Sequence, residues 1–323
     1  MKKLRKPLIY ILLILFIVVG SLSYVKFALP NVGDAPDIKI DATAERIERG
    51  RYLANNVTLC IDCHSQRDWT KFAGPPLAHS IGKGGEKFDE SIGFPGAVYS
   101  ANITPFNLKN WTDGELFRLI TTGVTKDGRA LMNIMPYPAY GRMDKEDIYD
   151  IIAYIRTLPE QASDIPERRL NVPLNLIVNT IPVPAALTTK PSPSDTIKYG
   201  GYLVNAAACV DCHTKQDKGS NVKGMEFAGG RDFLMPTGTV YSLNITADKA
   251  TGIGNWTREQ FINKFKMHAQ PDSGSELAKN QFQTVMPWTM YGKMKETDLA
   301  AMYAYLQTIN PIKNQVERFV AKK

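Results

Sequence analysis

Residue types that carry chemistry are scarce in this chain of 323 residues, which has only four cysteines and four histidines. The sequence contains no H-E-x-x-H metalloprotease motif, no G-x-S-x-G nucleophile motif and no P-loop. The dinucleotide-binding pattern G-x-G-x-x-G is absent as well. These absences exclude the common hydrolase and nucleotide-dependent mechanisms, and we predict no catalytic residue.

Charge of one sign is not concentrated in the chain either, although its formal net charge is +7. Four of the 39 Lys and Arg residues lie before position 7, and the remaining 35 nearly balance the 32 Asp and Glu residues. No later cluster of Lys and Arg is interleaved with aromatic residues. The sequence therefore predicts no nucleic-acid partner.

One long apolar run is present, from Leu8 to Val25. Eighteen helical residues extend over about 27 Å, which is enough for the hydrocarbon core of a bilayer. The basic residues before the run predict a cytoplasmic N-terminus. We therefore expect residues 1–29 to form a single-pass anchor in a bacterial inner membrane, with the remainder in the periplasm. The alternative is a cleaved signal peptide, because Ser21-Leu22-Ser23 offers a small-x-small cleavage site.

All four cysteines fall in two copies of the pentapeptide C-x-x-C-H, which is the attachment motif of c-type haem. Two thiols three residues apart on a helix share a face and can both bond the vinyl groups of one porphyrin, while the adjacent His supplies a nitrogen to the iron. A thioredoxin-like pair would need a βαβ context, and a closed zinc site would need a fourth ligand. We predict two covalently bound haem c groups. Their predicted binding residues are Cys60, Cys63, His64, Cys209, Cys212 and His213.

The segments around the two motifs are repeats of one another. Gly50 and Leu53 precede the first motif as Gly200 and Leu203 precede the second. The later matches, in the same order in both halves, are V-Y-S-x-N-I-T (98–104 and 240–246), N-W-T (110–112 and 255–257), M-P (135–136 and 286–287) and Y-G-x-M (140–143 and 291–294). One domain has been duplicated.

Each repeat closes on a predicted amphipathic helix, in which apolar residues recur at i, i+3, i+4 and i+7. The apolar positions are Ile148, Ile151, Ile152 and Ile155 in one repeat, and Leu299, Met302, Tyr303 and Leu306 in the other. The sequence predicts an all-α fold, in which haem domains at 43–160 and 194–311 follow one transmembrane helix. The proline-rich linker between them, 161–193, is too apolar for a flexible segment. We expect it to pack across both domains, with a loose tether as the alternative.

The second axial ligand of each iron decides the chemistry, because a methionine opposite the histidine gives a stable electron carrier and an open position permits peroxide chemistry. Each repeat has one Met-Pro dipeptide, at Met135 and Met286, and proline keeps the residue before it in an extended conformation. We predict these methionines as the distal ligands. Met143 and Met294 also repeat, and they fit a core position better. The predicted metal ligands are His64, Met135, His213 and Met286.

The order of helix, C-x-x-C-H, irregular segment, Met-Pro loop and closing helix resembles a class I c-type cytochrome domain. The finer strings N-I-T, N-W-T and M-P-x-x-x-Y-G-x-M resemble the multihaem cytochrome c subunits of membrane-bound alcohol, aldehyde and gluconate dehydrogenases. The resemblance covers about residues 43–310 and implies all-α domains with one exposed haem edge. Those subunits typically carry three haem domains, whereas this chain has two repeats.

The sequence thus predicts a dihaem cytochrome c that relays single electrons on the periplasmic face of the membrane. Its predicted partners are a dehydrogenase or respiratory complex on one side, and a terminal oxidase or soluble cytochrome on the other. The alternative is a dihaem enzyme of the peroxidase or thiosulfate dehydrogenase type. Such enzymes usually make their two haems unlike, whereas both repeats here offer the same ligand set.

Overall fold

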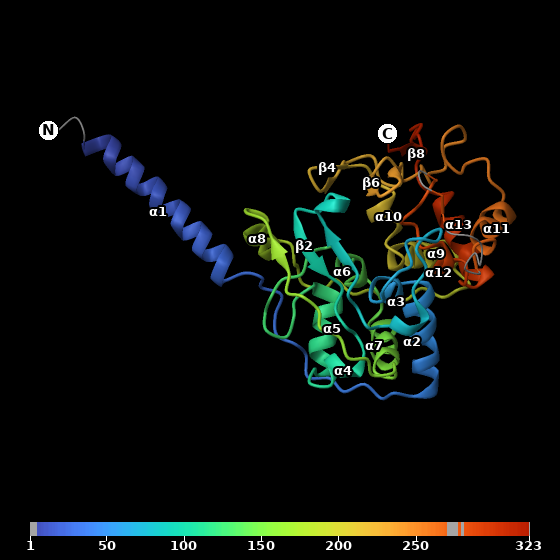
Figure 1. The fold of residues 1–323 in the computed structure, drawn as a ribbon, viewed down its shortest axis with the longest axis horizontal. Coiled ribbons are helices and arrows are strands. Elements are labelled where there is room, and N and C mark those ends of the chain that lie inside the picture. The colour runs from blue at the N-terminus through green and yellow to red at the C-terminus, as the bar shows by residue number, and fades with distance from the viewer. Residues whose placement is uncertain (1–4, 270–276, 279–280, 323) are drawn as a thin grey trace.

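A long helix, α1 (Arg5–Phe27), extends away from a compact body in the computed structural model (Figure 1). The structure describes residues 5–269, 277–278 and 281–322. Within these residues one helix, Pro7–Phe27, is long and apolar enough to cross a membrane, and its span is exposed. The helix therefore agrees with the predicted membrane segment in both position and length.

Among the residues that the structure describes, the two repeats share five helices in the same order, and the first repeat has three further short ones. The first contains α2 (Ala44–Asn56), α3 (Cys60–Cys63), η2 (Ala78–Ser80), η3 (Glu90–Ile92), α4 (Pro105–Leu108), α5 (Asp113–Thr122), α6 (Tyr137–Tyr140) and α7 (Lys145–Ile155). The second contains α9 (Thr196–Ala206), α10 (Cys209–Cys212), α11 (Arg258–Lys266), α12 (Trp288–Tyr291) and α13 (Glu296–Leu306). Between them lie α8 (Leu174–Ile177) and η4 (Val178–Thr180).

In each half the first helix of the repeat crosses the closing helix, α2 against α7 and α9 against α13. Leu53, Ile148 and Ile152 are fully buried at the first crossing. A methyl group added to Gly50 would lie 1.8 Å from the Asp150 carbonyl oxygen, and Gly200 is equally crowded in the second half. The repeated glycine is thus required because the two helix backbones touch there.

The prediction of an all-α fold is wrong, because short antiparallel strands accompany the helices in both halves. The described residues include two three-stranded sheets, ordered β1-β2-β3 and β6-β7-β8, and one hairpin, β4-β5. The strands are β1 (Lys87–Asp89), β2 (Gly96–Tyr99), β3 (Arg169–Leu170), β4 (Gln216–Asp217), β5 (Ser220–Asn221), β6 (Asp232–Met235), β7 (Gly238–Tyr241) and β8 (Phe319–Ala321). Runs of two to four residues are too short to show the alternating pattern of a strand.

The repeated V-Y-S strings lie at the central strands, β2 and β7, of these two sheets. Strand β3 comes from the predicted linker and pairs Arg169 with Ala97. Strand β8 follows the predicted end of the second domain and pairs Val320 with Thr239. Each sheet is therefore completed by a strand distant in sequence, and this pairing leaves no local signal.

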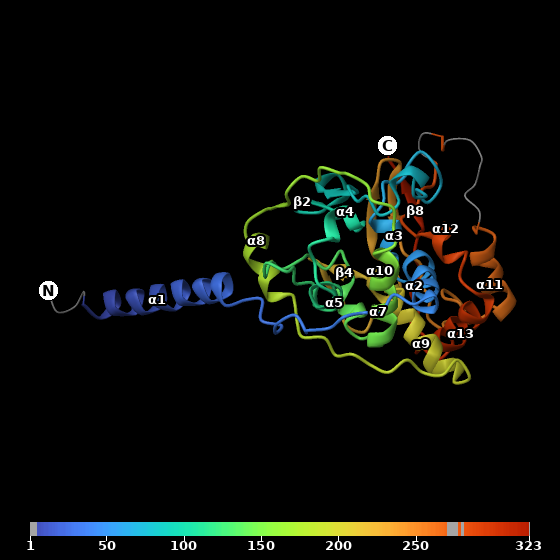
Figure 2. The same ribbon diagram turned by 90° about the horizontal axis from the view of Figure 1, so that it is seen from below.

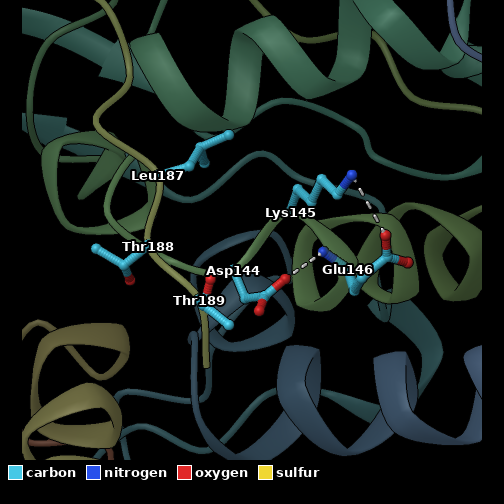
Figure 3. Close-up of a pocket in the computed structure, with 6 residues that line it drawn as sticks. All are labelled: Asp144, Lys145, Glu146, Leu187, Thr188 and Thr189. Atoms are coloured by element: carbon cyan, nitrogen blue, oxygen red, sulfur yellow. Dashed lines mark hydrogen bonds and ion pairs between the residues drawn. The ribbon is translucent and has the colours of Figure 1, made fainter. Parts of the chain in front are cut away.

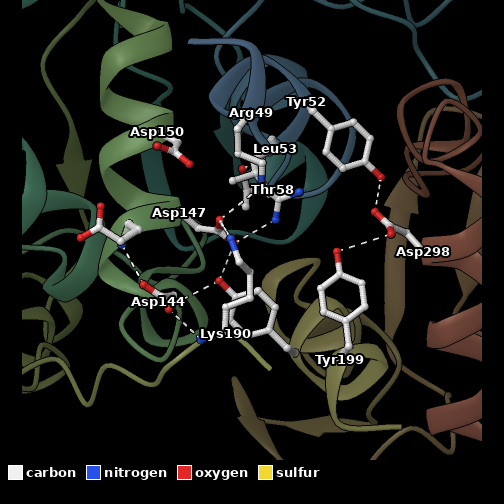
Figure 4. A network of polar contacts seen from close by, with 12 residues as sticks. Arg49, Tyr52, Leu53, Thr58, Asp144, Asp147, Asp150, Lys190, Tyr199 and Asp298 are labelled. Carbon is white, nitrogen blue, oxygen red and sulfur yellow. Dashed lines mark hydrogen bonds and ion pairs between the residues drawn. The ribbon is translucent and has the colours of Figure 1, made fainter. Parts of the chain in front are cut away.

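A polar network with approximate two-fold symmetry joins the halves (Figure 4). The Tyr52 hydroxyl donates to Asp298 at 2.6 Å, and the matching Tyr202 hydroxyl donates to Asp147 at 2.7 Å. Each tyrosine oxygen also accepts a hydrogen bond from a backbone N–H of the other half. The residue that donates it lies three positions before the aspartate. The duplicated residues hence pair with each other across the boundary, and the two halves are held in one arrangement.

The linker follows the surface of the first half. Thr188 donates from its hydroxyl to the Arg142 carbonyl at 2.7 Å, and the Lys190 ammonium lies 2.7 Å from the Asp147 carboxylate. Asp147 also forms an ion pair with Arg49 at 3.0 Å and is fully buried. The end of the linker is consequently tied to the same aspartate that binds the second half.

Candidate haem-attachment sites

Both C-x-x-C-H motifs lie on a one-turn helix that follows a sharp change of chain direction. Leu59 before α3 and Ala208 before α10 have left-handed backbones, with φ of 60° and 51°. Non-glycine residues adopt this conformation rarely, and its cost is accepted most often at functional sites. The turn separates each motif from the preceding helix, so that its two cysteines start and end a helical turn of their own.

The four cysteines are free thiols, and Cys212 is the most exposed. Burial raises the pKa of the Cys60 thiol to about 11 and the pKa values of Cys63 and Cys209 to about 12. A redox-active C-x-x-C pair needs a thiol with a lowered pKa, so these surroundings disfavour a thioredoxin-like use. Free thiols at both ends of one helical turn fit the donor set required for two thioether bonds to one porphyrin.

Each motif histidine is oriented by a backbone carbonyl. The His64 Nδ1 atom lies 2.7 Å from the Ala101 oxygen, and the His213 Nδ1 atom lies 2.7 Å from the Leu243 oxygen. A carbonyl partner requires the proton on Nδ1, which leaves the Nε2 lone pair available for a metal. Burial lowers the pKa of both imidazoles, which favours the neutral form that ligates. Both histidines therefore fit the role of an axial iron ligand.

Two glycines hold the loop that brings these carbonyls to the histidines. The Gly84 N–H donates to the His64 carbonyl at 2.8 Å, and the Gly229 N–H donates to the His213 carbonyl at the same distance. A methyl group on either glycine would lie 2.5 Å from the backbone of residue 101 or 243. Both glycines have positive φ. These positions were missed in the sequence analysis, although the pairs at 84–85 and 229–230 offered a signal.

Each predicted methionine ligand lies in a loop that is tied to its own C-x-x-C-H motif. Met135 and Met286 are partly buried, and both carbonyls accept the N–H two residues on, at 2.8 Å. The Tyr291 hydroxyl on α12 donates to the Ala207 carbonyl, two residues before Cys209, at 2.8 Å. Tyr140 on α6 binds the carbonyl of residue 58 in the same way. In each half, the methionine loop is thus joined to the cysteine motif by the same kind of tyrosine hydrogen bond.

The other two repeated methionines and the two histidines outside the motifs lie in different surroundings. Met143 and Met294 are fully buried in the hydrophobic core. His79 is exposed on η2, whereas the His268 ring packs against Trp288 with centroids 4.9 Å apart. The contrast in burial favours Met135 and Met286 over Met143 and Met294 as distal ligands.

The repeated asparagines have a structural role. Asn102 and Asn244 are buried, and their side-chain oxygens accept the N–H and the hydroxyl of the threonine two residues on, at 2.7 to 2.9 Å. The threonines of the N-W-T strings, Thr112 and Thr257, cap helices α5 and α11 in full capping boxes. These strings recur in both halves because the same turns and helix starts recur.

Gln283 was not anticipated from the sequence. It lies three residues before Met286, and its side chain is buried against the first half. Its amide oxygen accepts the Ala73 N–H at 2.8 Å, and its amide nitrogen donates to the carbonyls of Trp69 and Lys71. The loop after the first motif therefore supports the methionine loop of the second half.

The hollow drawn in Figure 3 is separate from these sites. It has a cavity volume of about 330 Å³ and lies where the linker passes the start of α7. Its lining residues are Asp144, Lys145, Glu146, Leu187, Thr188 and Thr189, and none of the predicted haem residues is among them.

Comparisons with known proteins support the assignment of a c-type cytochrome, and the family match covers the second motif. Residues 197–310 match the cytochrome c family. The chain is 28% identical, over 288 residues, to the cytochrome c subunit of the quinone alcohol dehydrogenase of Gluconacetobacter polyoxogenes. The aligned region covers 84% of this chain and 58% of that subunit. It is 37% identical over 132 residues to the gluconate 2-dehydrogenase cytochrome c subunit of Pantoea cypripedii, covering 41% of this chain and 27% of the relative.

A third relative is the fructose dehydrogenase cytochrome subunit of Gluconobacter japonicus, which is 34% identical to this chain over 132 residues. The aligned region covers 39% of this chain and 25% of that subunit. The chain thus spans 58% of the alcohol dehydrogenase subunit and about a quarter of the other two. The predicted resemblance to the cytochrome c subunits of such dehydrogenases is confirmed by these similarities. Subunits of this kind transfer electrons and are not the catalytic subunits of their complexes.

Proposed function

We propose that this chain is a dihaem cytochrome c that relays single electrons at the periplasmic face of a bacterial inner membrane. Cys60 and Cys63 would hold the first haem through thioethers, with His64 and Met135 as its axial ligands. The second haem would be held by Cys209, Cys212, His213 and Met286. When bound, each haem iron supplies a one-electron couple between its ferric and ferrous forms.

The observation that carries this proposal is the recurrence of one ligand-positioning scheme in two halves of one chain. In both, a backbone carbonyl orients the histidine and a tyrosine hydroxyl joins the methionine loop to the cysteine turn. The protein's task would be to hold these ligands in place around each haem. Two equal ligand sets favour a relay over an enzyme, which would need one open iron.

The relatives indicate the kind of partner that this chain would have. Each is a cytochrome subunit of an alcohol, gluconate or fructose dehydrogenase. We therefore propose a dehydrogenase as the electron donor and a membrane oxidase or soluble cytochrome as the acceptor. Helix α1 would keep the carrier at the membrane, with the basic N-terminal residues on the cytoplasmic side.

Haem attachment tests the cofactor proposal directly. The purified protein is expected to keep two haems per chain after acid–acetone extraction, because thioether bonds resist it. The double variant Cys209→Ala with Cys212→Ala is expected to keep one covalent haem, and the matched variant Cys60→Ala with Cys63→Ala is expected to keep the other. Pyridine haemochrome spectra and intact mass measure both. A wild-type protein with a single haem, or with zinc, would contradict the proposal.

The anchor is tested by the mature N-terminus. If α1 is retained, the intact mass includes residues 1–29, and the protein stays in the membrane fraction through a high-salt wash, since the apolar span is insensitive to salt. A soluble periplasmic protein that begins near Tyr24 would show that the segment is a signal peptide. Addition of protease to spheroplasts is the companion test of topology, and both haem domains should be digested together.

A further inference from the structure

A stretch of twenty residues without any charge lies between Arg169 and Lys190, in the predicted linker. It contains the one-turn helices α8 and η4. Several of its apolar side chains face solvent, with 80% of Val172, 47% of Ile177 and 57% of Val183 exposed. Uncharged, exposed apolar surface of this kind indicates an interaction site.

The same stretch lies beside the C-terminal end of α1, in both views of the molecule (Figures 1 and 2). The Asn179 side chain donates to the Val25 carbonyl at 3.2 Å. Val25 is accordingly half-buried, whereas its neighbours Tyr24 and Phe27 are 60% and 78% exposed. The contact connects the linker to the last turn of the membrane helix.

The length of α1 sets the depth of this contact. Its apolar span, Pro7–Phe27, has 21 residues. At the helical rise per residue this is about 30 Å, which matches the hydrocarbon thickness of a bilayer. Val25 therefore lies at the edge of the hydrocarbon, and so does a side chain that binds its carbonyl.

The composition of the stretch suits that depth. Val178 is fully buried, whereas Val172 and Ile177 are exposed to solvent. Asn175 and Thr180 are exposed and can bond lipid headgroups. Arg169, at the edge of the stretch, is exposed as well and carries the charge that anionic headgroups attract.

We propose that residues 172–183 form a second membrane contact, in which Val172 and Ile177 enter the outer-leaflet interface beside α1. The inference rests on the proposed anchoring by α1. Its occupant is the lipid bilayer, because the stretch is continuous with the membrane helix and meets it at the hydrocarbon edge. A single helix allows the body to swivel, whereas two contacts hold the haem domains in one orientation towards the membrane.

The test uses the full-length haem-loaded protein in vesicles of phosphatidylethanolamine and phosphatidylglycerol. A photoreactive benzoylphenylalanine replaces one residue at a time, at Val172, Ile177, Tyr24 or Met267, and mass spectrometry counts lipid adducts after irradiation. Tyr24 reports the anchor. Met267 is the matched control, because it is 68% exposed and follows α11, which lies at the far end of the body from α1.

Lipid adducts at positions 172 and 177 are expected to exceed those at 267 at least several-fold, and the change Ile177→Glu is expected to reduce the adduct at 172 by a similar factor. Adducts at 24 with only the control level at 172 and 177 would overturn this inference and leave the anchor in place. A lack of adducts at 24 would overturn the anchor and the second contact together. Adducts of 172 or 177 with another protein chain would make the stretch a protein interface and overturn the lipid assignment.

Discussion

Replacing Met135 with alanine is expected to lower the reduction potential of one haem by roughly a few tenths of a volt, because the thioether stabilises the ferrous iron. The same change should convert that haem to a high-spin form and remove about half of the far-red sulfur-to-iron charge-transfer band. Met286→Ala should have the equivalent effect on the other haem. Redox titration followed by visible and electron paramagnetic resonance spectra measures all three effects.

Met143→Ala and Met294→Ala are the matched controls, since both side chains are fully buried in the core. Each should cost about 2–5 kcal/mol of unfolding free energy and leave the charge-transfer band intact. The experiment also separates the carrier from the enzyme. A wild-type protein that already contains one high-spin haem, or that consumes peroxide by itself, would refute the relay and support a dihaem enzyme.

Replacing Asp147 is expected to destabilise the protein more than any other polar change at the boundary between the halves. Its carboxylate is fully buried and meets Arg49 at 3.0 Å, Lys190 at 2.7 Å and the Tyr202 hydroxyl at 2.7 Å. Removal of one partner from a buried ion pair costs about 3–5 kcal/mol. Because Arg49 and Lys190 keep some contact with solvent, we expect roughly 2–3 kcal/mol for Asp147→Asn in denaturant unfolding.

The pH dependence of this loss follows from the pKa of Asp147. Burial opposes its ionisation, yet the hydrogen bonds and charges of Arg49 and Lys190 prevail and lower its pKa. A lowered pKa means that the stabilisation is complete above the pKa of an unfolded aspartate, about 4, and is lost as the pH falls through the folded value. The difference in unfolding free energy between wild type and Asp147→Asn should therefore shrink at acidic pH.

Asp298→Asn provides the control for that experiment. Asp298 occupies the matching position and accepts hydrogen bonds from Tyr52 and Tyr199, but it forms no ion pair within the described part of the chain. Its replacement should cost roughly 1 kcal/mol. An equal loss for both variants would show that the tyrosine hydrogen bonds, and not the ion pairs of Asp147 with Arg49 and Lys190, account for the loss of stability.

Much of the site could be predicted from the sequence because its signals are local. The spacing of Cys60 and Cys63 reports one helical turn, and the apolar periodicity at Ile148, Ile151 and Ile152 reports a helix face. Both the α3 turn and helix α7 are present in the structure. The repeat itself was visible because the second half carries the same strings.

The parts that could not be predicted depend on pairing over long distances. Strand β3 joins a sheet some 70 residues upstream, and two residues are too few to display a strand pattern. The carbonyls of Ala101 and Leu243 orient the histidines, yet a backbone carbonyl has the same chemistry at every residue. No signal in the sequence therefore identified these two carbonyls.

The kind of cofactor, the two C-x-x-C-H motifs, an apolar helix long enough to cross a membrane and the repeated residues could all be predicted from the sequence. Three features depend on the tertiary structure: the difference in burial between the repeated methionines, the exchange of partners by Tyr52 and Tyr202 across the halves, and the contact of the linker with α1. The physical reason is the same in each case. Residue identity limits what a side chain can do, whereas burial and partners are set by segments that the fold brings together from distant parts of the chain.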